Sequence, residues 1–178
     1  MKKTSMMIIL VYILTAWLIV DDITSMEDFN FSLQYNVGGR DFISTYDNIL
    51  TVDTVAGIKT VEFHLSDKDK RRIKGKIESL GIMEEDFASL PKSGLVISPL
   101  GKYNLMITLN GVEKRAYWTT EYINPIVFPI KEKPTDPASR YEGEYGRVNK
   151  LFDLKNFIVD IIMEYETFKS LPKHKMYL

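Results

Sequence analysis

The chain has 178 residues, a formal net charge of -1 and no cysteine. Hydrophobic residues make up 45% of it and charged residues 26%, which is the balance of one folded domain rather than of a disordered or collagen-like chain. The low net charge provides no overall field to attract nucleic acid, so we expect no nucleic-acid partner. The lack of cysteine excludes disulfides, thiolate nucleophiles, zinc-thiolate sites and a lipid-modified cysteine.

Residues 1–22 have the pattern of a signal anchor or signal peptide. Lys2 and Lys3 precede an uncharged run from Met6 to Val20, and Asp21 and Asp22 follow it. As a helix the run would be about 22 Å long, which suits either the apolar region of a signal peptide or a thin membrane anchor. A buried core helix is a weaker alternative, because the run is apolar on all sides.

The residues after this run favour retention over cleavage. Signal peptidase requires small residues at alternate positions, and no Ala-x-Ala-like site follows Val20. The two lysines should stay in the cytoplasm, so the rest of the chain is expected outside the cell membrane. We therefore expect a single-pass anchor and one extracytoplasmic domain over residues 23–178, with secretion after cleavage as the alternative.

Period-two alternation predicts several strands in the first part of the domain. The first is expected from Phe29 to Val37 and the second from Phe42 to Thr45, with a return strand from Ile49 to Val52. A further strand is expected from Ile58 to Leu65. Its alternate residues Val61, Phe63 and Leu65 should face the core.

A short amphipathic helix should follow, beginning after Ser66 and ending near Leu80. Ser66 stands at an N-cap position, Asp67 and Asp69 lie in the first turn, and Gly81 follows as a stop. We interpret the basic residues of this helix as a solvated face, with a docking patch for acidic lipid or polymer as the alternative. These residues are Lys68, Lys70, Arg71, Arg72, Lys74 and Lys76.

The last third contains a hairpin, a long loop and a long helix. Strands from Tyr103 to Leu109 and from Val112 to Trp118 flank Asn110-Gly111, a pair typical of a type I′ turn. Thr119 to Arg147 is proline-rich and is expected to be a loop, and apolar spacing predicts a helix from Val148 to Phe168. The predicted fold class is α+β, an antiparallel sheet with the long C-terminal helix and the shorter helix packed on it.

This order of elements resembles that of a group of small exported or membrane-anchored proteins of Bacillus-like Gram-positive bacteria. The resemblance covers roughly Asn48 to Leu178. It rests on a strand running into Leu65-Ser66-Asp67-Lys68-Asp69-Lys70, on the hairpin that reaches Trp118, and on Glu164-Tyr165 followed by Leu171-Pro172 and Tyr177-Leu178. These proteins are mostly uncharacterised, so the resemblance implies export but no activity.

The chain offers few groups for catalysis or metal binding. Its two histidines are His64 and His174, and neither has a sequence context that indicates a catalytic base. His64 lies two residues after Glu62 on the same face of a predicted strand. We interpret that pair as a surface ion pair, since a metal would need a third ligand. No metal, cofactor or catalytic residue is predicted.

The proline-rich loop is the candidate binding region, because long loops often carry binding residues. We favour the interpretation that its apolar residues fold back over the sheet, with a ligand or partner site as the alternative. The candidate binding residues are Tyr122, Phe128, Arg140, Tyr141 and Tyr145.

Three functions are compatible with these patterns. The leading hypothesis is a non-enzymatic extracytoplasmic binding module, held at the membrane by its N-terminal helix, whose partner is an envelope protein or peptide. The second is a small extracytoplasmic hydrolase acting on cell-wall polymer or peptide, which would require a pocket with converging acids. The third is an inhibitor or propeptide-like domain.

Overall fold

The structure is a computed structural model that describes residues 28–90, 100–120, 141–142 and 145–175. A meander of strands is followed by a helix, a hairpin and two further helices. The elements are β1 (Phe29–Tyr35), β2 (Asp41–Ser44), β3 (Ile49–Thr54), β4 (Gly57–Glu62), α2 (Asp67–Ser79), β5 (Lys102–Leu109), β6 (Val112–Thr119), α3 (Gly146–Glu164) and α4 (Glu166–Lys169).

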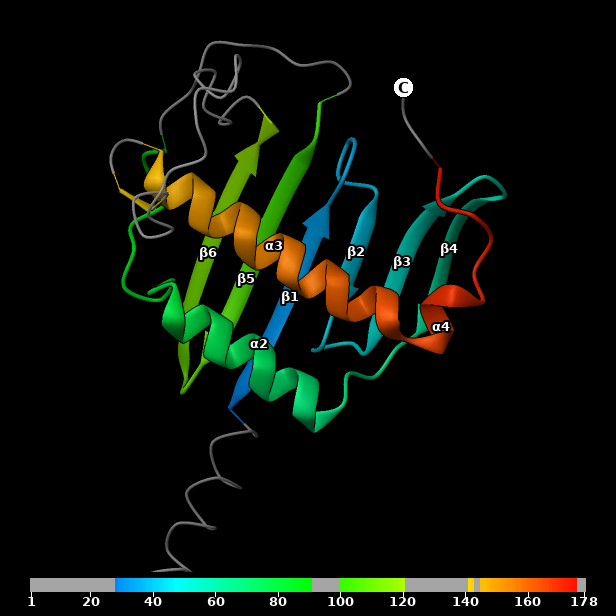
Figure 1. Ribbon diagram of the computed structural model, residues 1–178, viewed down its shortest axis with the longest axis horizontal. Helices are drawn as coiled ribbons and strands as arrows, with labels where there is room; N and C mark the ends of the chain where they lie inside the picture. Colours follow the sequence, from blue (N-terminus) through cyan, green and yellow to red (C-terminus); the bar gives the residue numbers. More distant parts are fainter. Residues whose placement is uncertain (1–27, 91–99, 121–140, 143–144, 176–178) are drawn as a thin grey trace, which may run out of the picture.

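The strands form one six-stranded antiparallel sheet in the order β4-β3-β2-β1-β5-β6. The meander β1 to β4 grows in one direction from β1, and the later hairpin β5-β6 adds to the other side of β1 (Figure 1). The chain therefore has to cross the sheet between β4 and β5, and α2 makes that crossing. The α+β fold class predicted from the sequence is confirmed.

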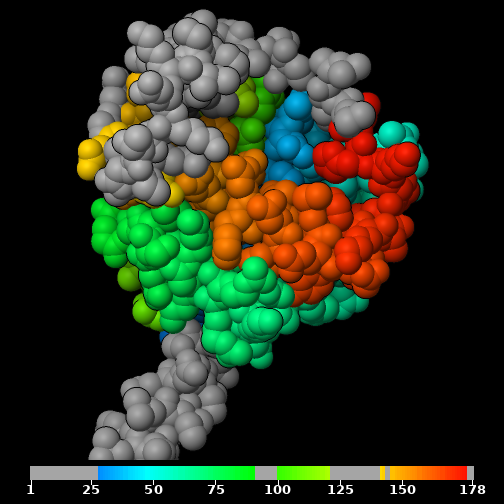
Figure 2. Space-filling model, viewed as in Figure 1, coloured from blue at the N-terminus to red at the C-terminus, as the bar shows by residue number. Residues whose placement is uncertain are grey.

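All three described helices lie on one face of the sheet. Figure 1 shows α3 running diagonally across the strands, with α2 beside it and α4 near β3 and β4. In the space-filling view α2 and α3 pack side by side over that face, with α4 next to α3 (Figure 2). The opposite face of the sheet receives no described helix.

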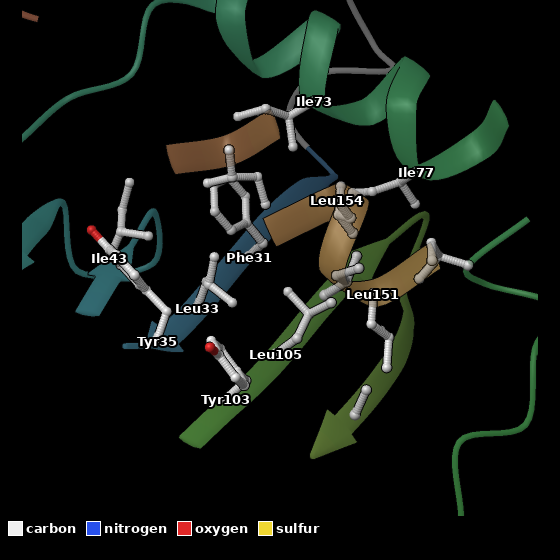
Figure 3. Packing of buried hydrophobic residues seen from close by; sticks show 14 of the residues in the cluster. Phe31, Leu33, Tyr35, Ile43, Ile73, Ile77, Tyr103, Leu105, Leu151 and Leu154 are labelled. Carbon is white, nitrogen blue, oxygen red and sulfur yellow. The ribbon is translucent and has the colours of Figure 1, made fainter. Parts of the chain in front are cut away.

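The core lies between the sheet and α2 and α3. Alternate residues of β1, among them Phe31 and Leu33, point toward Leu154 of α3 and Ile73 of α2, and all four are fully buried (Figure 3). Burying each such side chain contributes roughly 1.5–3 kcal/mol, so this contact stabilises the packing of both helices on the sheet.

Short local signals set the ends of several elements as the sequence predicted. The Ser66 hydroxyl accepts from the backbone N–H of Asp69 at 3.1 Å and caps α2, and Gly81 has a φ of +62° just after that helix. Asn110 and Gly111 have φ values of +51° and +75°, as a type I′ turn requires. The predicted strand from Ile58 ends earlier than expected, at Glu62, although Phe63 and Leu65 are buried.

The prediction of one continuous helix from Val148 to Phe168 is wrong. α3 ends at Glu164, because Tyr165 has an extended backbone with φ -77° and ψ 138°, and α4 then begins at Glu166. The Tyr165 hydroxyl donates to Oδ2 of Asp69 at 2.6 Å and accepts from the N–H of Ser66 at 2.9 Å. Its ring also packs on Phe63 with centroids 5.0 Å apart. These contacts hold Tyr165 away from the helical path.

Among residues 28–90, 100–120, 141–142 and 145–175, no helix is long and apolar enough to cross a bilayer. The predicted membrane helix within residues 1–22 and most of the predicted loop from Thr119 to Arg147 lie outside the described residues.

Candidate functional site

The face of the sheet opposite the helices, called the open face below, carries the less buried half of the alternation of most strands, in which polar side chains predominate on β1 and β5. On β1, for example, Phe31 and Leu33 enter the core, whereas Ser32 and Gln34 point the other way. Because the strands are paired in a defined register, the outward side chains line up from strand to strand.

One row of side chains crosses all six strands of the open face, and none of its members is charged. Each neighbour in the row is the direct cross-strand partner of the next. The row, called the central row below, is Thr60–Thr51–Phe42–Gln34–Asn104–Tyr117. With strands about 4.8 Å apart, it extends over roughly 24 Å.

The central row combines aromatic rings with amide and hydroxyl groups. Tyr117 is 54% exposed and Phe42 is half-buried, and the exposed amides of Gln34 and Asn104 lie between them. The Gln34 amide donates to the carbonyl of Gly39 at 2.6 Å, which fixes its orientation. The Thr51 and Thr60 hydroxyls are 2.9 Å apart. The row therefore offers two aromatic surfaces and a set of neutral donors and acceptors.

A second row runs parallel to the first, two residues further along each strand. It is Glu62–Ile49–Ser44–Ser32–Met106–Arg115. Its charged members stand at its two ends, and each has a hydrogen-bonding partner. Arg115 Nε lies 2.7 Å from Oε1 of Glu113, and His64 Nε2 lies 2.8 Å from Oε1 of Glu62. The central row thus carries no charge, and both charged members of the second row are hydrogen-bonded.

A turn closes the open face beyond the second row. Tyr46, in the turn between β2 and β3, places its hydroxyl 2.7 Å from Oγ1 of Thr108 on β5. The Thr45 hydroxyl beside it bonds to Oδ1 of Asn30 and to the carbonyl of Phe31, at 3.1 Å each. This turn is therefore fixed to the sheet and bounds the surface on that side.

A separate polar cluster lies at the end of the sheet where β2 begins. The Asp41 carboxylate is fully buried, and its Oδ2 lies 2.7 Å from Nε2 of His174 and also accepts from the Asn36 amide. Its Oδ1 accepts from the backbone N–H of Asp53 at 2.7 Å. Burial, together with the charge of Asp41, raises the pKa of the neighbouring Tyr35 hydroxyl far above its ordinary value.

The cluster ties the end of the described chain to the sheet. The N–H of Val55 donates to the carbonyl of Lys173 at 2.9 Å, and the N–H of Lys175 donates to the carbonyl of Asp53 at 3.0 Å. His174 thus forms an isolated antiparallel β-bridge with Thr54, beyond the last residue of β3 that pairs with β2. A hollow of about 330 Å³ lies beside it, lined by Val52, Met163, Phe168, Lys169, Leu171, Pro172, Lys173 and His174.

Two of the five sequence-predicted binding residues lie in the part of the chain that the structure describes. Tyr141 packs against the core, and its hydroxyl donates to Oδ2 of Asp153 at 2.6 Å. Tyr145 precedes the first turn of α3. The other three, Tyr122, Phe128 and Arg140, lie outside the described residues.

The two histidines have different surroundings. His64 and Glu62 form the exposed surface pair that the sequence predicted, and the described ranges contain no group of three or more His, Asp or Glu side chains that could hold a metal. His174, however, belongs to the buried cluster around Asp41. Its sequence context gave no sign of this, because its partner is 133 residues away.

Neither a protein-family model nor a curated protein matches this chain.

Proposed function

We propose that the chain is a non-enzymatic binding module, held at the outer surface of the cell membrane by its N-terminal segment. The open face is its contact surface, and its target is an uncharged, polar component of the cell envelope. The observation that carries the proposal is the central row, in which neutral polar and aromatic side chains from six strands line up on a face that no described helix covers.

The composition of the open face supports binding of a polar target. A sheet face that packs against another protein layer is rich in apolar residues, because packing removes it from water. Here the outward residues of the central strand β1 are Asn30, Ser32 and Gln34, and their neighbours on β5 are Asn104, Met106 and Thr108. Such a surface remains hydrated when free and can exchange water for the polar groups of a ligand.

The proposed tether enters at one end of the sheet, away from the central row. Asp28 precedes β1, and its carbonyl accepts from the N–H of Asn110 at 3.2 Å, which fixes that end against the β5-β6 hairpin. Gln34 lies six residues further along an extended strand, about 20 Å away. The central row would therefore stand clear of the bilayer from which the tether emerges.

A hydrolase is the second candidate, because the Asp41–His174 pair borders the apolar hollow. A histidine held by a buried carboxylate supplies two of the three members of a catalytic triad. The hydrogen-bond partners of His174 in the described structure are Asp41 and Asn36, and neither is a nucleophile. The pair therefore favours a structural role, and hydrolysis would have to use water directly.

Site-specific photo-crosslinking in intact cells tests the proposal. A photoreactive amino acid replaces Asn104 on the open face or, as a matched control, Asn156 on the exposed side of α3. We expect a strong adduct with envelope material from position 104 and little from position 156. Equal adducts from both positions, or none from position 104, would remove the open face from the proposal.

A further inference from the structure

We infer that the ligand of the open face is a neutral glycan chain lying along the central row, across the strands. This inference rests on the proposed function, since it names the chemical class of the target bound by the same surface. Three features of the row carry it: its aromatic rings, its uncharged hydrogen-bonding groups and its length.

The aromatic rings match the apolar faces of sugar rings. A pyranose ring has C–H groups on its faces and hydroxyls around its edge, so it packs flat on an aromatic side chain while its hydroxyls remain free for hydrogen bonds. Tyr117 on the edge strand β6 is 54% exposed, and Phe42 lies three strands away in the same row. Two rings separated by roughly 14 Å can contact two sugar units of one chain.

The groups between the rings match hydroxyls rather than charges. Amide side chains both donate and accept, as a sugar hydroxyl does, and those of Gln34 and Asn104 lie side by side in the row. The hydroxyls of Thr51 and Thr60 continue the row toward β4. Because no member is ionised, a neutral ligand binds without leaving a desolvated charge unpaired.

Other partner classes fit this surface less well. A nucleic acid needs cations along its phosphates, and the central row has none. A bilayer surface needs a broad exposed apolar patch with a cationic rim, whereas the middle of the open face consists of Ser32, Gln34 and Asn104. A second copy of the chain would need a more apolar interface core than Ser32, Gln34 and Asn104 provide.

The length of the row points to a polymer rather than a single sugar. Roughly 24 Å of aligned side chains exceeds what one monosaccharide can contact. A monosaccharide should therefore bind much more weakly than an oligosaccharide, because each further sugar unit meets another strand of the row.

Isothermal titration calorimetry with defined oligosaccharides tests the inference. The full-length protein, kept in a detergent without sugar headgroups, is titrated with hexamers of N-acetylglucosamine, β-linked glucose and α-linked glucose, and with N-acetylglucosamine itself. We expect at least one hexamer to bind, and to bind at least tenfold more tightly than the monosaccharide. Failure of all three hexamers to bind at millimolar concentration would overturn the glycan assignment.

Matched variants locate the binding. We expect Tyr117→Ala to weaken the binding of the hexamer about tenfold, Tyr117→Phe to retain most of it, and Asn156→Ala to leave it unchanged. Asn104→Asp, which places a charge in the row without a large change in shape, should also weaken binding and serves if Tyr117→Ala does not fold. Full binding by both Tyr117→Ala and Asn104→Asp would overturn the inference.

Two further outcomes separate this inference from the proposed function. If position 104 crosslinks to an envelope protein while no hexamer binds, the open face is a binding surface but its ligand is not a glycan. If sedimentation shows a dimer that Tyr117→Ala dissociates, a second copy occupies the face, and both the glycan assignment and the proposed function are wrong.

Discussion

Nε2 of His174 lies 2.7 Å from Oδ2 of Asp41, a fully buried carboxylate 133 residues earlier in the chain. Burying a carboxylate is costly unless hydrogen bonds satisfy it, and His174, Asn36 and the N–H of Asp53 provide them. The same bond attaches the strand-like segment from Lys173 to Lys175 to the sheet. Asp41 and His174 therefore join the middle of the sheet to the end of the described chain.

We predict that His174→Ala lowers the free energy of unfolding by about 1–3 kcal/mol, because it leaves a buried carboxylate short of a donor. It should also speed hydrogen exchange at the N–H groups of Val55 and Lys175, which are protected by the backbone hydrogen bonds between residues 173–175 and β3. Urea denaturation and amide exchange measure the two effects. His64→Ala is the control, since the exposed His64–Glu62 pair should contribute no more than about 1 kcal/mol. Equal effects of the two variants would refute the structural role of His174.

Two glycines should respond to alanine with opposite signs. Gly75 lies within α2, and a Cβ there would meet nothing within 4 Å, so Gly75→Ala should stabilise the fold by about 0.5–1 kcal/mol. Gly111 has a φ of +75° in the hairpin turn, so Gly111→Ala should destabilise the fold by about 1–2 kcal/mol. Denaturant midpoints compare the two variants. Shifts in the same direction would contradict the assigned backbone conformations.

Tyr165 and Asp69 should make stability depend on pH in the acid range. Although partial burial of Asp69 opposes the shift, hydrogen bonds from Tyr165, Ser66 and Arg72 hold the pKa of this carboxyl below its ordinary value. The Asp69 carboxyl therefore binds a proton more readily in the unfolded chain than in the folded chain. The ionised Asp69 therefore stabilises the folded state above about pH 4, the ordinary pKa of the carboxyl. This stabilisation is lost as the pH falls through the lower pKa that Asp69 has in the folded chain.

Tyr165→Phe tests this linkage. We expect it to lower the free energy of unfolding by about 1–2 kcal/mol at pH 7. The difference in unfolding free energy between the variant and the wild type should narrow as the pH is lowered below 4. Tyr46→Phe is the matched control, because the Tyr46 hydroxyl bonds to Thr108, which does not titrate in this range. Urea denaturation at several pH values measures both. A difference for Tyr165→Phe that stays constant with pH would argue against an ionised Asp69 as its partner.

Local patterns in the sequence predicted most of the fold. The alternation in β1, the N-cap at Ser66 and the turn at Asn110-Gly111 depend on neighbouring residues, and the structure confirms all three. The break of the last helix at Tyr165 was missed, because the apolar spacing continues through it. The break depends on contacts with Asp69 and Phe63, which are remote in sequence.

The candidate site was less predictable than the fold. The alternation predicted from Phe29 to Val37 implied that this strand has a polar side, and that side lies on the open face. It could not show that Gln34 aligns with Phe42 and Asn104, because that alignment depends on which strands pair and in what register. Of the predicted loop residues, Tyr141 donates a hydrogen bond to Asp153 of α3, and Tyr145 immediately precedes that helix.

Chemical-shift mapping by NMR tests the central claim most directly. Amide spectra of the full-length protein are recorded with and without the oligosaccharide that binds best. We predict that the largest shifts cluster at the central row, at Thr51, Gln34, Asn104 and Tyr117, and that α2 and α3 remain unchanged. Shifts confined to the helices or to the hollow beside His174, or no shifts at all, would contradict the open face as the binding surface.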